Sequence, residues 1–135
     1  MNVGSLGLGL IGGSLARAYS KAGHTVYVHD KDTSTADFAE LAGISHGKLN
    51  IETVPSCDLI LLAVYTGAAI RWLEEHAQYC RNSCTVIDCC GIKTEICNRG
   101  FRLAKQHGFT FVGGHPMAGS HFSGFKYSRS NLFQG

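Results

Sequence analysis

A glycine-rich segment near the start of the chain has the residue types that hold a phosphate group. It reads G-L-G-L-I-G-G, from Gly7 to Gly13, between an apolar run and a stretch with helical spacing. In that context Gly7 permits a tight turn, Gly9 lets a pyrophosphate approach the backbone, and Gly12 lets helix and strand pack closely. The phosphates then rest on the helix N-terminus, where N–H groups are free and the helix dipole is positive.

An acidic residue stands where the second half of this signature is expected. Asp30 lies 23 positions after Gly7, at the end of a second β-type run. A carboxylate there binds both hydroxyls of an adenosine ribose and repels a 2′-phosphate, so the spacing favours NAD over NADP, although Lys31 beside it softens that repulsion. The alternative is a glycine-rich turn with an incidental aspartate. The predicted cofactor-binding residues are Gly7, Leu8, Gly9, Leu10, Ile11, Gly12, Asp30, Ala63, Val64 and Tyr65.

One histidine near the end of the chain is enclosed by glycines. In FVGGHPMAGSHFSG, residues 111–124, His115 follows an apolar run and two glycines. Glycines let the backbone come close to a bound molecule, and Pro116 fixes the direction of the chain. Because histidine accepts a proton near neutral pH, His115 is the candidate general base. The remaining histidines are expected to be solvated or hydrogen-bonded: His24, His29, His46, His76, His107 and His121.

Short β-type runs that alternate with longer helical stretches are the scaffold for these residues. The run CDLILLAV is almost continuously apolar, which is typical of a parallel strand covered on both faces. The pattern predicts an α/β fold of the Rossmann type: a doubly wound, mainly parallel sheet with helices on both faces. Residues 44–55 give no clear pattern. Strands are expected at 1–6, 24–30, 57–64, 85–90 and 109–114, and helices at 11–22, 34–42, 67–80 and 93–107.

Length and charge restrict the class of protein. The chain has 135 residues, enough for one domain, and its 12 basic and 10 acidic residues form no run of like charge. This balance argues against nucleic acid or an anionic membrane as a partner and favours a small molecule. The apolar start has no preceding basic residue, is soon followed by Arg17 and is rich in glycine, so we predict neither an export signal nor a membrane span, and a cytoplasmic protein.

Six cysteines are present without the paired C-x2-C spacing of a zinc site, so no metal site is predicted. Without an export signal the thiols are expected to stay reduced. Free cysteine is among the most buried residue types, so a structural role is the default. The six are Cys57, Cys80, Cys84, Cys89, Cys90 and Cys97.

Three motifs together resemble the prephenate dehydrogenase family of tyrosine biosynthesis. They are V-G-S-L-G-L-G-L-I-G-G-S-L-A (3–16), D-x-x-x-x-K (88–93), and G-G-H-P-M-A-G-S-x-x-S-G (113–124) followed by N-L-F-Q-G (131–135). The resemblance covers essentially the whole chain. H-P-M-A-G is its most specific part, because other nucleotide-binding dehydrogenases share the glycine fingerprint and lack that segment.

The resemblance implies an NAD-dependent oxidative decarboxylation of prephenate to 4-hydroxyphenylpyruvate. The matching position for the histidine that hydrogen-bonds the C4 hydroxyl is His115. It also implies that Gly91, Gly114 and Ser120 lie at the substrate. The chain departs from the family where D-x-G-S-x-K becomes D-C-C-G-I-K, so Gly91 replaces a serine whose place a water, Cys90 or a backbone group must fill. A second departure is His121, which stands where an acidic residue is common.

Family members are longer than this chain and continue into a helical domain that forms a homodimer and anchors the substrate carboxylates. The resemblance therefore implies that residues 1–135 are the NAD-binding domain at the N-terminus of a longer protein, or a nucleotide-binding domain that needs another chain. The alternatives are an arogenate dehydrogenase, a β-hydroxyacid or imine reductase on a similar domain, and a non-catalytic NAD-sensing module.

Overall fold

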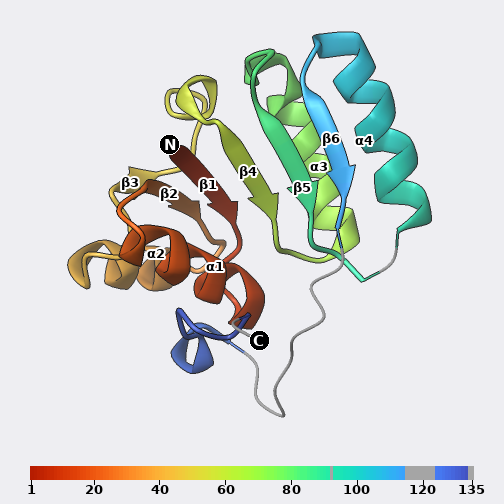
Figure 1. The fold of residues 1–135 in the computed structure, drawn as a ribbon. Helices are drawn as coiled ribbons and strands as arrows, with labels where there is room; N and C mark the ends of the chain where they lie inside the picture. The colour runs from red at the N-terminus through yellow and green to blue at the C-terminus, as the bar shows by residue number, and fades with distance from the viewer. Residues whose placement is uncertain (92, 115–123, 134–135) are drawn as a thin grey trace.

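Six parallel strands form one sheet in the computed structural model, which describes residues 1–91, 93–114 and 124–133. The strand order is β3-β2-β1-β4-β5-β6, and every neighbouring pair is parallel (Figure 1). The chain changes direction across the sheet between β1 and β4, and ligands bind at such a switch point in doubly wound folds. The predicted Rossmann-type α/β fold is confirmed. The strands are β1 (Asn2–Leu6), β2 (Thr25–His29), β3 (Gly47–Lys48), β4 (Leu59–Leu62), β5 (Thr85–Asp88) and β6 (Thr110–Gly113).

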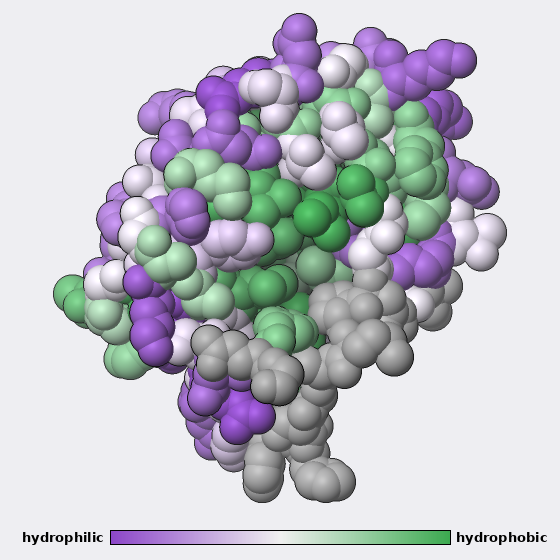
Figure 2. Space-filling model, in the orientation of Figure 1, coloured by the Kyte–Doolittle hydropathy of each residue, from purple (hydrophilic) through white to green (hydrophobic). Residues whose placement is uncertain are grey.

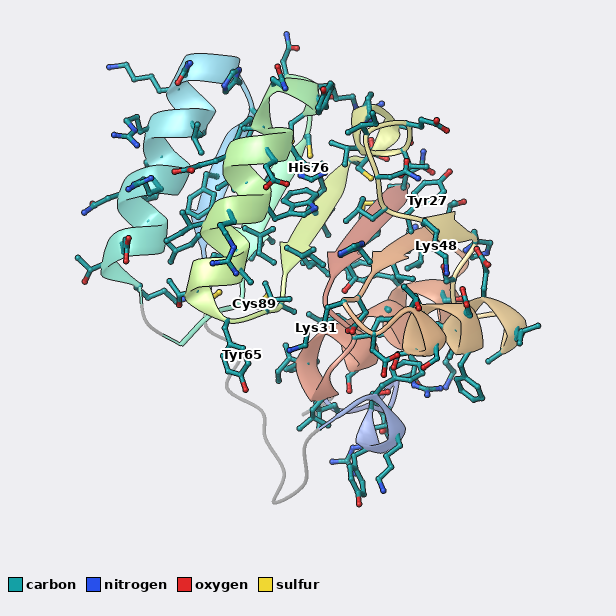
Figure 3. The ribbon with its side chains drawn as sticks, turned by 180° about the vertical axis from the view of Figure 1, so that it is seen from behind. Tyr27, Lys31, Lys48, Tyr65, His76 and Cys89 are labelled. Atoms are coloured by element: carbon teal, nitrogen blue, oxygen red, sulfur yellow. The ribbon has the colours of Figure 1, made fainter. Side chains whose placement is uncertain are left out.

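Helices cover both faces of the sheet. Helices α1 and α2 pack on one face, and α3 and α4 pack side by side on the other (Figures 1 and 3). Three single-turn 3-10 helices complete the described part of the chain. The helices are α1 (Leu10–Lys21), α2 (Thr33–Leu41), α3 (Thr66–His76), α4 (Thr94–His107), η1 (Val54–Ser56), η2 (Ala77–Tyr79) and η3 (Phe125–Tyr127).

Most predicted element boundaries differ from the observed ones by one or two residues, and two differences are larger. The helix expected over 67–80 is α3 followed by η2, because the last turn tightens and the chain leaves at Cys80 in extended backbone. The stretch 44–55, which gave no pattern, contains the two-residue strand β3, which pairs with Tyr27 and Val28. Two residues are too few to show a period, so β3 is detected only through its partner strand.

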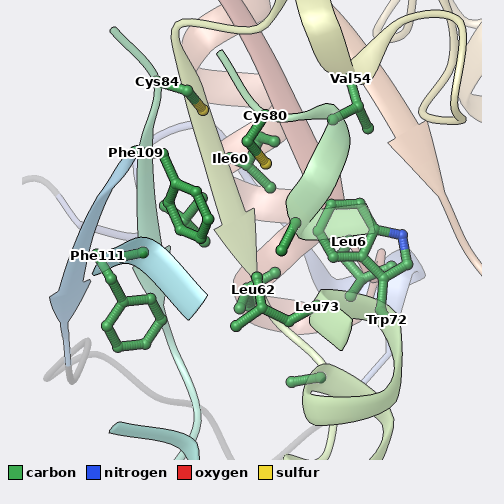
Figure 4. Close-up of a cluster of buried hydrophobic side chains, with 14 of the residues drawn as sticks. Leu6, Val54, Ile60, Leu62, Trp72, Leu73, Cys80, Cys84, Phe109 and Phe111 are labelled. Carbon is green, nitrogen blue, oxygen red and sulfur yellow. The ribbon is translucent and has the colours of Figure 1, made fainter. Parts of the chain in front are cut away.

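Strand β4 divides the core into two layers. All four of its residues are buried. Ile60 and Leu62 face α3 and α4, where they join the hydrophobic cluster that contains Trp72 (Figure 4). Leu59 and Leu61 face the opposite side. Because both faces of β4 are buried, this strand is held firmly within the sheet. It therefore helps to position the loops that follow β1 and β4.

The face of the sheet opposite α3 and α4 has less cover near β6. Val112 of β6 is 41% exposed, and Ile87 is half-buried. Figure 2 shows apolar surface gathered near the centre of the side seen in Figure 1. Strand β6 is thus held mainly from one side, by α4 through Phe111.

All six cysteines are free thiols, and four of them are buried, as the sequence predicts. Burial raises the pKa of Cys57 to about 12, so this thiol stays protonated at neutral pH. Within the described ranges no group of histidine, cysteine and acidic side chains is arranged to hold a metal ion. No helix in the described part of the chain is both long and apolar enough to cross a membrane.

Candidate functional site

A cleft of about 890 Å³ opens at the carboxyl ends of β1, β2, β4 and β5. This volume is in the range of small-molecule sites, which in such sheets lie at this edge. In Figure 3, Lys31, Tyr65 and Cys89 lie at this end of the sheet. Ten residues predicted from the sequence line the cleft: Gly7, Leu8, Gly9, Leu10, Ile11, Asp30, Ala63, Val64, Tyr65 and Gly91.

The turn after β1 requires glycine at two positions. Gly7 has φ of +95°, and a Cβ on it would lie 2.3 Å from the carbonyl oxygen of Ala63. A Cβ on Gly12 would lie 2.1 Å from the carbonyl oxygen of Gly7. Gly12 is therefore not in the cleft lining but beneath it, where it lets α1 approach the β1 turn. The roles assigned to both glycines from spacing agree with these contacts.

Gly9 has open space where the other two glycines have close neighbours. A Cβ built on Gly9 meets nothing within 4 Å, so the space beside it belongs to the cleft. Gly9 is also the N-cap of α1, and no side chain caps this helix end or places an acid in its first turn. The N–H groups of Leu10 and Ile11 are therefore available to a ligand, and the helix dipole favours an anion there. This arrangement fits the pyrophosphate of a dinucleotide.

Asp30 lies beside this helix end and holds the loop. Its Oδ2 accepts a hydrogen bond of 2.8 Å from Leu8 N, and its Oδ1 accepts one of 2.9 Å from Asp32 N. Two carboxylate oxygens accept about four hydrogen bonds, so capacity remains for ribose hydroxyls. Asp30 thus both fixes the glycine loop and presents free acceptor positions to the cleft. The first of these roles was not predicted from the sequence.

A buried ion pair holds the loop after β5. The side chain of Asp88 is 0% exposed, and its Oδ2 lies 2.7 Å from Lys93 Nζ. Its Oδ1 accepts a hydrogen bond of 2.8 Å from Cys90 N. The D-x-x-x-x-K spacing thus closes a loop over five residues, and the exposed Gly91 lies at the cleft.

The Cys90 side chain lies where the family pattern has glycine. Its Sγ donates a hydrogen bond of 3.0 Å to the carbonyl oxygen of Val64. Burial is the main cause that raises the pKa of Cys90 to about 12, so the thiol is neutral. Burial likewise raises the pKa of Cys89 to about 11. Both cysteines line the cleft as neutral groups, and neither supplies a charge to a ligand.

The candidate substrate residues are only partly placed. Gly114 N donates a hydrogen bond of 2.8 Å to the carbonyl oxygen of Asp88, so this residue extends the β5–β6 pairing, and it does not line the cleft. His115, Ser120 and His121 lie outside the described residues. The chain is described again from Gly124, which does line the cleft.

One side of the cleft comes from α3 and was missed in the sequence. Arg71, Trp72 and Glu75 line it together with Ala68. These positions have the i, i+3, i+4, i+7 spacing of one helix face. The spacing was visible in the sequence, but it marks a face that packs on the sheet as readily as one that lines a ligand site.

Comparison with known proteins identifies the family to which this geometry belongs. A family model described as prephenate dehydrogenase, nucleotide-binding domain, matches residues 15–135. This chain belongs to the prephenate dehydrogenase family. The family match begins inside α1, and the preceding glycine loop is assigned from its own contacts.

Relatives in sequence and structure agree with this assignment. A prephenate dehydrogenase of Lactococcus lactis is 32% identical over 132 residues, which cover 96% of this chain and 37% of that protein. The crystal structure of Synechocystis arogenate dehydrogenase superposes with a TM-score of 0.87 at 27% identity, over 98% of this chain and 46% of that one. Prephenate dehydrogenase from A. aeolicus, in complex with hydroxyphenyl propionate and NAD+, superposes with a TM-score of 0.76 at 30% identity, over 100% and 48%.

The chain of this prephenate dehydrogenase family member spans about half the length of the solved relatives. The matched part is a nucleotide-binding domain, and one solved relative holds NAD+. The expectation of a dinucleotide cofactor in this family member is thereby confirmed. The choice between prephenate and arogenate is not decided by similarity, because relatives of both names match.

Proposed function

We propose that this chain is the NAD-binding part of a prephenate dehydrogenase, which converts prephenate to 4-hydroxyphenylpyruvate and CO2. The observation that carries the proposal is the cleft itself. The uncapped start of α1, the open space at Gly9 and the acceptor positions of Asp30 meet in it. Membership of the prephenate dehydrogenase family supplies the reaction class.

Different residues of the cleft bind different parts of NAD. The backbone N–H groups of Leu10 and Ile11 bind the pyrophosphate, and Asp30 accepts hydrogen bonds from the adenosine ribose. Ala63, Val64 and Tyr65 follow β4, which lies between β1 and β5 in the sheet, and they line the cleft. When bound, NAD+ accepts the hydride that leaves C4 of the substrate.

His115 is the proposed general base. It takes the proton of the C4 hydroxyl while C4 is oxidised to a carbon of the aromatic ring. The bond from the ring to its carboxylate breaks, its electron pair completes the aromatic ring, and CO2 leaves. Gly91, Gly114 and Ser120 are the proposed neighbours of the substrate. Strand β6 ends at Gly113, which pairs with Asp88 of β5. The chain therefore leaves β6 at the carboxyl edge of the sheet, where the cleft lies.

Arogenate is the second candidate substrate, favoured by the close superposition on Synechocystis arogenate dehydrogenase. The two substrates differ only in an amine or keto group on the side chain. NADH formation with prephenate and with arogenate, each with NAD and NADP, on the longest natural form of the protein separates them. Activity with prephenate and NAD is the expected result. Faster turnover of arogenate would reassign the substrate and keep the reaction.

His115→Asn tests the proposed base. Turnover should fall by roughly 10²-fold or more, because general base catalysis is lost, while the Kd for NAD changes little. The matched control is His107→Asn at the end of α4, because His107 does not line the cleft. An undiminished rate in His115→Asn would favour a reductase of another substrate class. NAD binding without turnover of either substrate would favour a sensing module.

The remaining proposals concern the whole protein. We propose that residues 1–135 are the NAD-binding domain of a longer, cytoplasmic homodimer, because the family resemblance implies a helical dimerisation domain and the chain spans 46% of a solved relative. Light scattering on the complete protein tests the dimer, and a monomer mass would contradict it.

A further inference from the structure

A second cavity lies between α1 and the segment that follows η3. Its volume is about 420 Å³. Three of its lining residues are cationic, three carry hydroxyl groups, and none carries a carboxylate. No lining residue is shared with the cofactor cleft. The seven residues are Arg17, Ser20, Lys21, Ile44, Ser128, Arg129 and Ser130.

The three cations of this cavity have no carboxylate partner in the described part of the chain. The ion pairs found there use Lys48, Arg81, Lys93 and Arg99 instead. Three like charges at one concave surface raise the local positive potential and attract an anion. An anion bound there offsets their mutual repulsion.

The fold holds the side chain of one of these cations in place and anchors the backbone of a second. Arg17 Nε donates a hydrogen bond of 2.7 Å to Ser128 Oγ, and the Arg17 guanidinium lies 4.6 Å from the ring centre of Phe125. The backbone N of Arg129 donates a hydrogen bond of 2.9 Å to Ser14 Oγ on α1. Because Arg17 uses its Nε internally, its terminal nitrogens remain for a ligand. Groups fixed before binding lose less entropy when the ligand arrives.

We propose that this cavity binds a phosphate group, as inorganic phosphate or as a phosphate monoester. A guanidinium matches the planar spacing of two phosphate oxygens, and serine hydroxyls donate to the others. A phosphate dianion neutralises more of the charge of several cations than a single carboxylate does. The cavity exceeds the size of one phosphate ion, so a small phosphorylated molecule also fits.

The site is separate from the cofactor cleft but connected to it through a short segment. Gly124 lines the cleft, η3 follows, and residues 128–130 line the cavity (Figure 1). Helix η3 packs on α1, where a Cβ on Gly13 would lie 2.7 Å from the Phe125 ring. An anion that bridges Arg17 and Arg129 therefore strengthens the contact of this segment with α1.

The test is calorimetric titration of the full-length protein at constant ionic strength, with and without saturating NAD. The ligands are inorganic phosphate, glycerol phosphate and succinate, with chloride as the screening control. Saturable binding of phosphate or glycerol phosphate in both conditions is the expected result. Tighter binding of glycerol phosphate identifies a phosphorylated molecule as the natural ligand. Binding lost with NAD present would place the phosphate in the cofactor cleft and overturn the proposal.

Charge-removing variants locate the site. Arg17→Gln and Arg129→Gln should each weaken phosphate binding by about tenfold, since each removes a charge-assisted contact. Lys105→Gln, an exposed cation on α4, is the matched control and should leave binding unchanged. The Arg129 side chain is exposed and has no hydrogen bond or ion pair to the described residues, so that variant stays informative if Arg17→Gln is unstable. Phosphate affinity unchanged in both arginine variants, or equal heats with phosphate and chloride, would overturn the proposal.

Discussion

Asp30 and Asp88 stand at equivalent places on the sheet and differ in what they offer to a ligand. Asp88 is the last residue of β5, and Asp30 directly follows β2. Asp88 is fully buried, is paired with Lys93, and accepts a hydrogen bond from the loop that follows it. Asp30 is half-buried, accepts two backbone hydrogen bonds, has no cation within ion-pair distance among the described residues, and faces the cleft.

The difference shows how environment assigns a role to one residue type. A buried carboxylate needs a paired cation, and once paired it has little left to offer a ligand. A half-buried carboxylate that accepts two backbone hydrogen bonds keeps open acceptor positions. One acid therefore fixes a loop, whereas the other fixes a loop and is available to a cofactor. The variants below separate these two roles.

Lys93→Met should give the largest effect on stability. It leaves the Asp88 carboxylate buried without its cation, and we expect a loss of about 3 kcal/mol. This is the low end of the range for breaking a buried pair, because the Lys93 side chain is 30% exposed. Urea denaturation measures the loss. Lys105→Met on the exposed side of α4 is the control. A loss below about 1 kcal/mol would show that the pair behaves like a surface ion pair.

The glycine loop beside Asp30 gives the next effect. Gly12→Ala places a Cβ against the Gly7 carbonyl oxygen and should cost about 2 kcal/mol of stability through overpacking. Gly9→Ala meets no neighbour in the protein, so its stability should change by less than about 0.5 kcal/mol. NAD affinity should nevertheless fall in Gly9→Ala, because the added methyl group occupies the part of the cleft proposed to hold the pyrophosphate. Equal stability of the two variants, measured by thermal unfolding, would contradict the packing argument.

Asp30→Asn tests the role of the second acid, which we expect to contact the cofactor. It removes the charge but keeps one oxygen acceptor, so we expect NAD affinity to fall about tenfold through the loss of a charge-assisted hydrogen bond. Affinity for NADP should fall less or rise, since the repulsion of a 2′-phosphate disappears. Fluorescence titration with both cofactors measures the ratio. Glu40→Gln, an exposed acid on α2, is the control. An unchanged ratio would remove Asp30 from cofactor selection.

A third carboxylate, at the opposite end of the sheet, gives the smallest effect. A backbone hydrogen bond from Asn2 and the charge of Arg81 hold the pKa of Asp58 below its usual value. This interaction stabilises the fold above the ordinary aspartate pKa, and the contribution is lost as the pH falls through the lowered value. Asp58→Asn should cost less than about 1 kcal/mol at neutral pH. Its stability should also vary less with pH below 4, which acid unfolding curves test.

The sequence predicted most of the scaffold because its elements have clear periods and boundaries. The apolar run around Leu59–Leu62 indicated a strand buried on both faces, and the glycines after β1 indicated the turn. Strand β3 was missed because two residues have no period of their own. The α3 side of the cleft was missed because the positions of Arg71 and Glu75 are equally compatible with a solvated helix face.

The sequence by itself determined where the glycine turn after β1 lies and which acid follows it at the expected distance. The backbone conformation of a glycine turn and the start of a helix depend on a few neighbouring residues, so both can be predicted directly from the sequence. The tertiary structure decided the rest, because it depends on residues that are far apart in the chain. It brought Asp30 to Leu8 and left it open to the cleft, buried Asp88 against Lys93, and brought Ser128 to Arg17 across 111 positions. Burial and charge pairing are set by packing, and packing is not visible in any one segment.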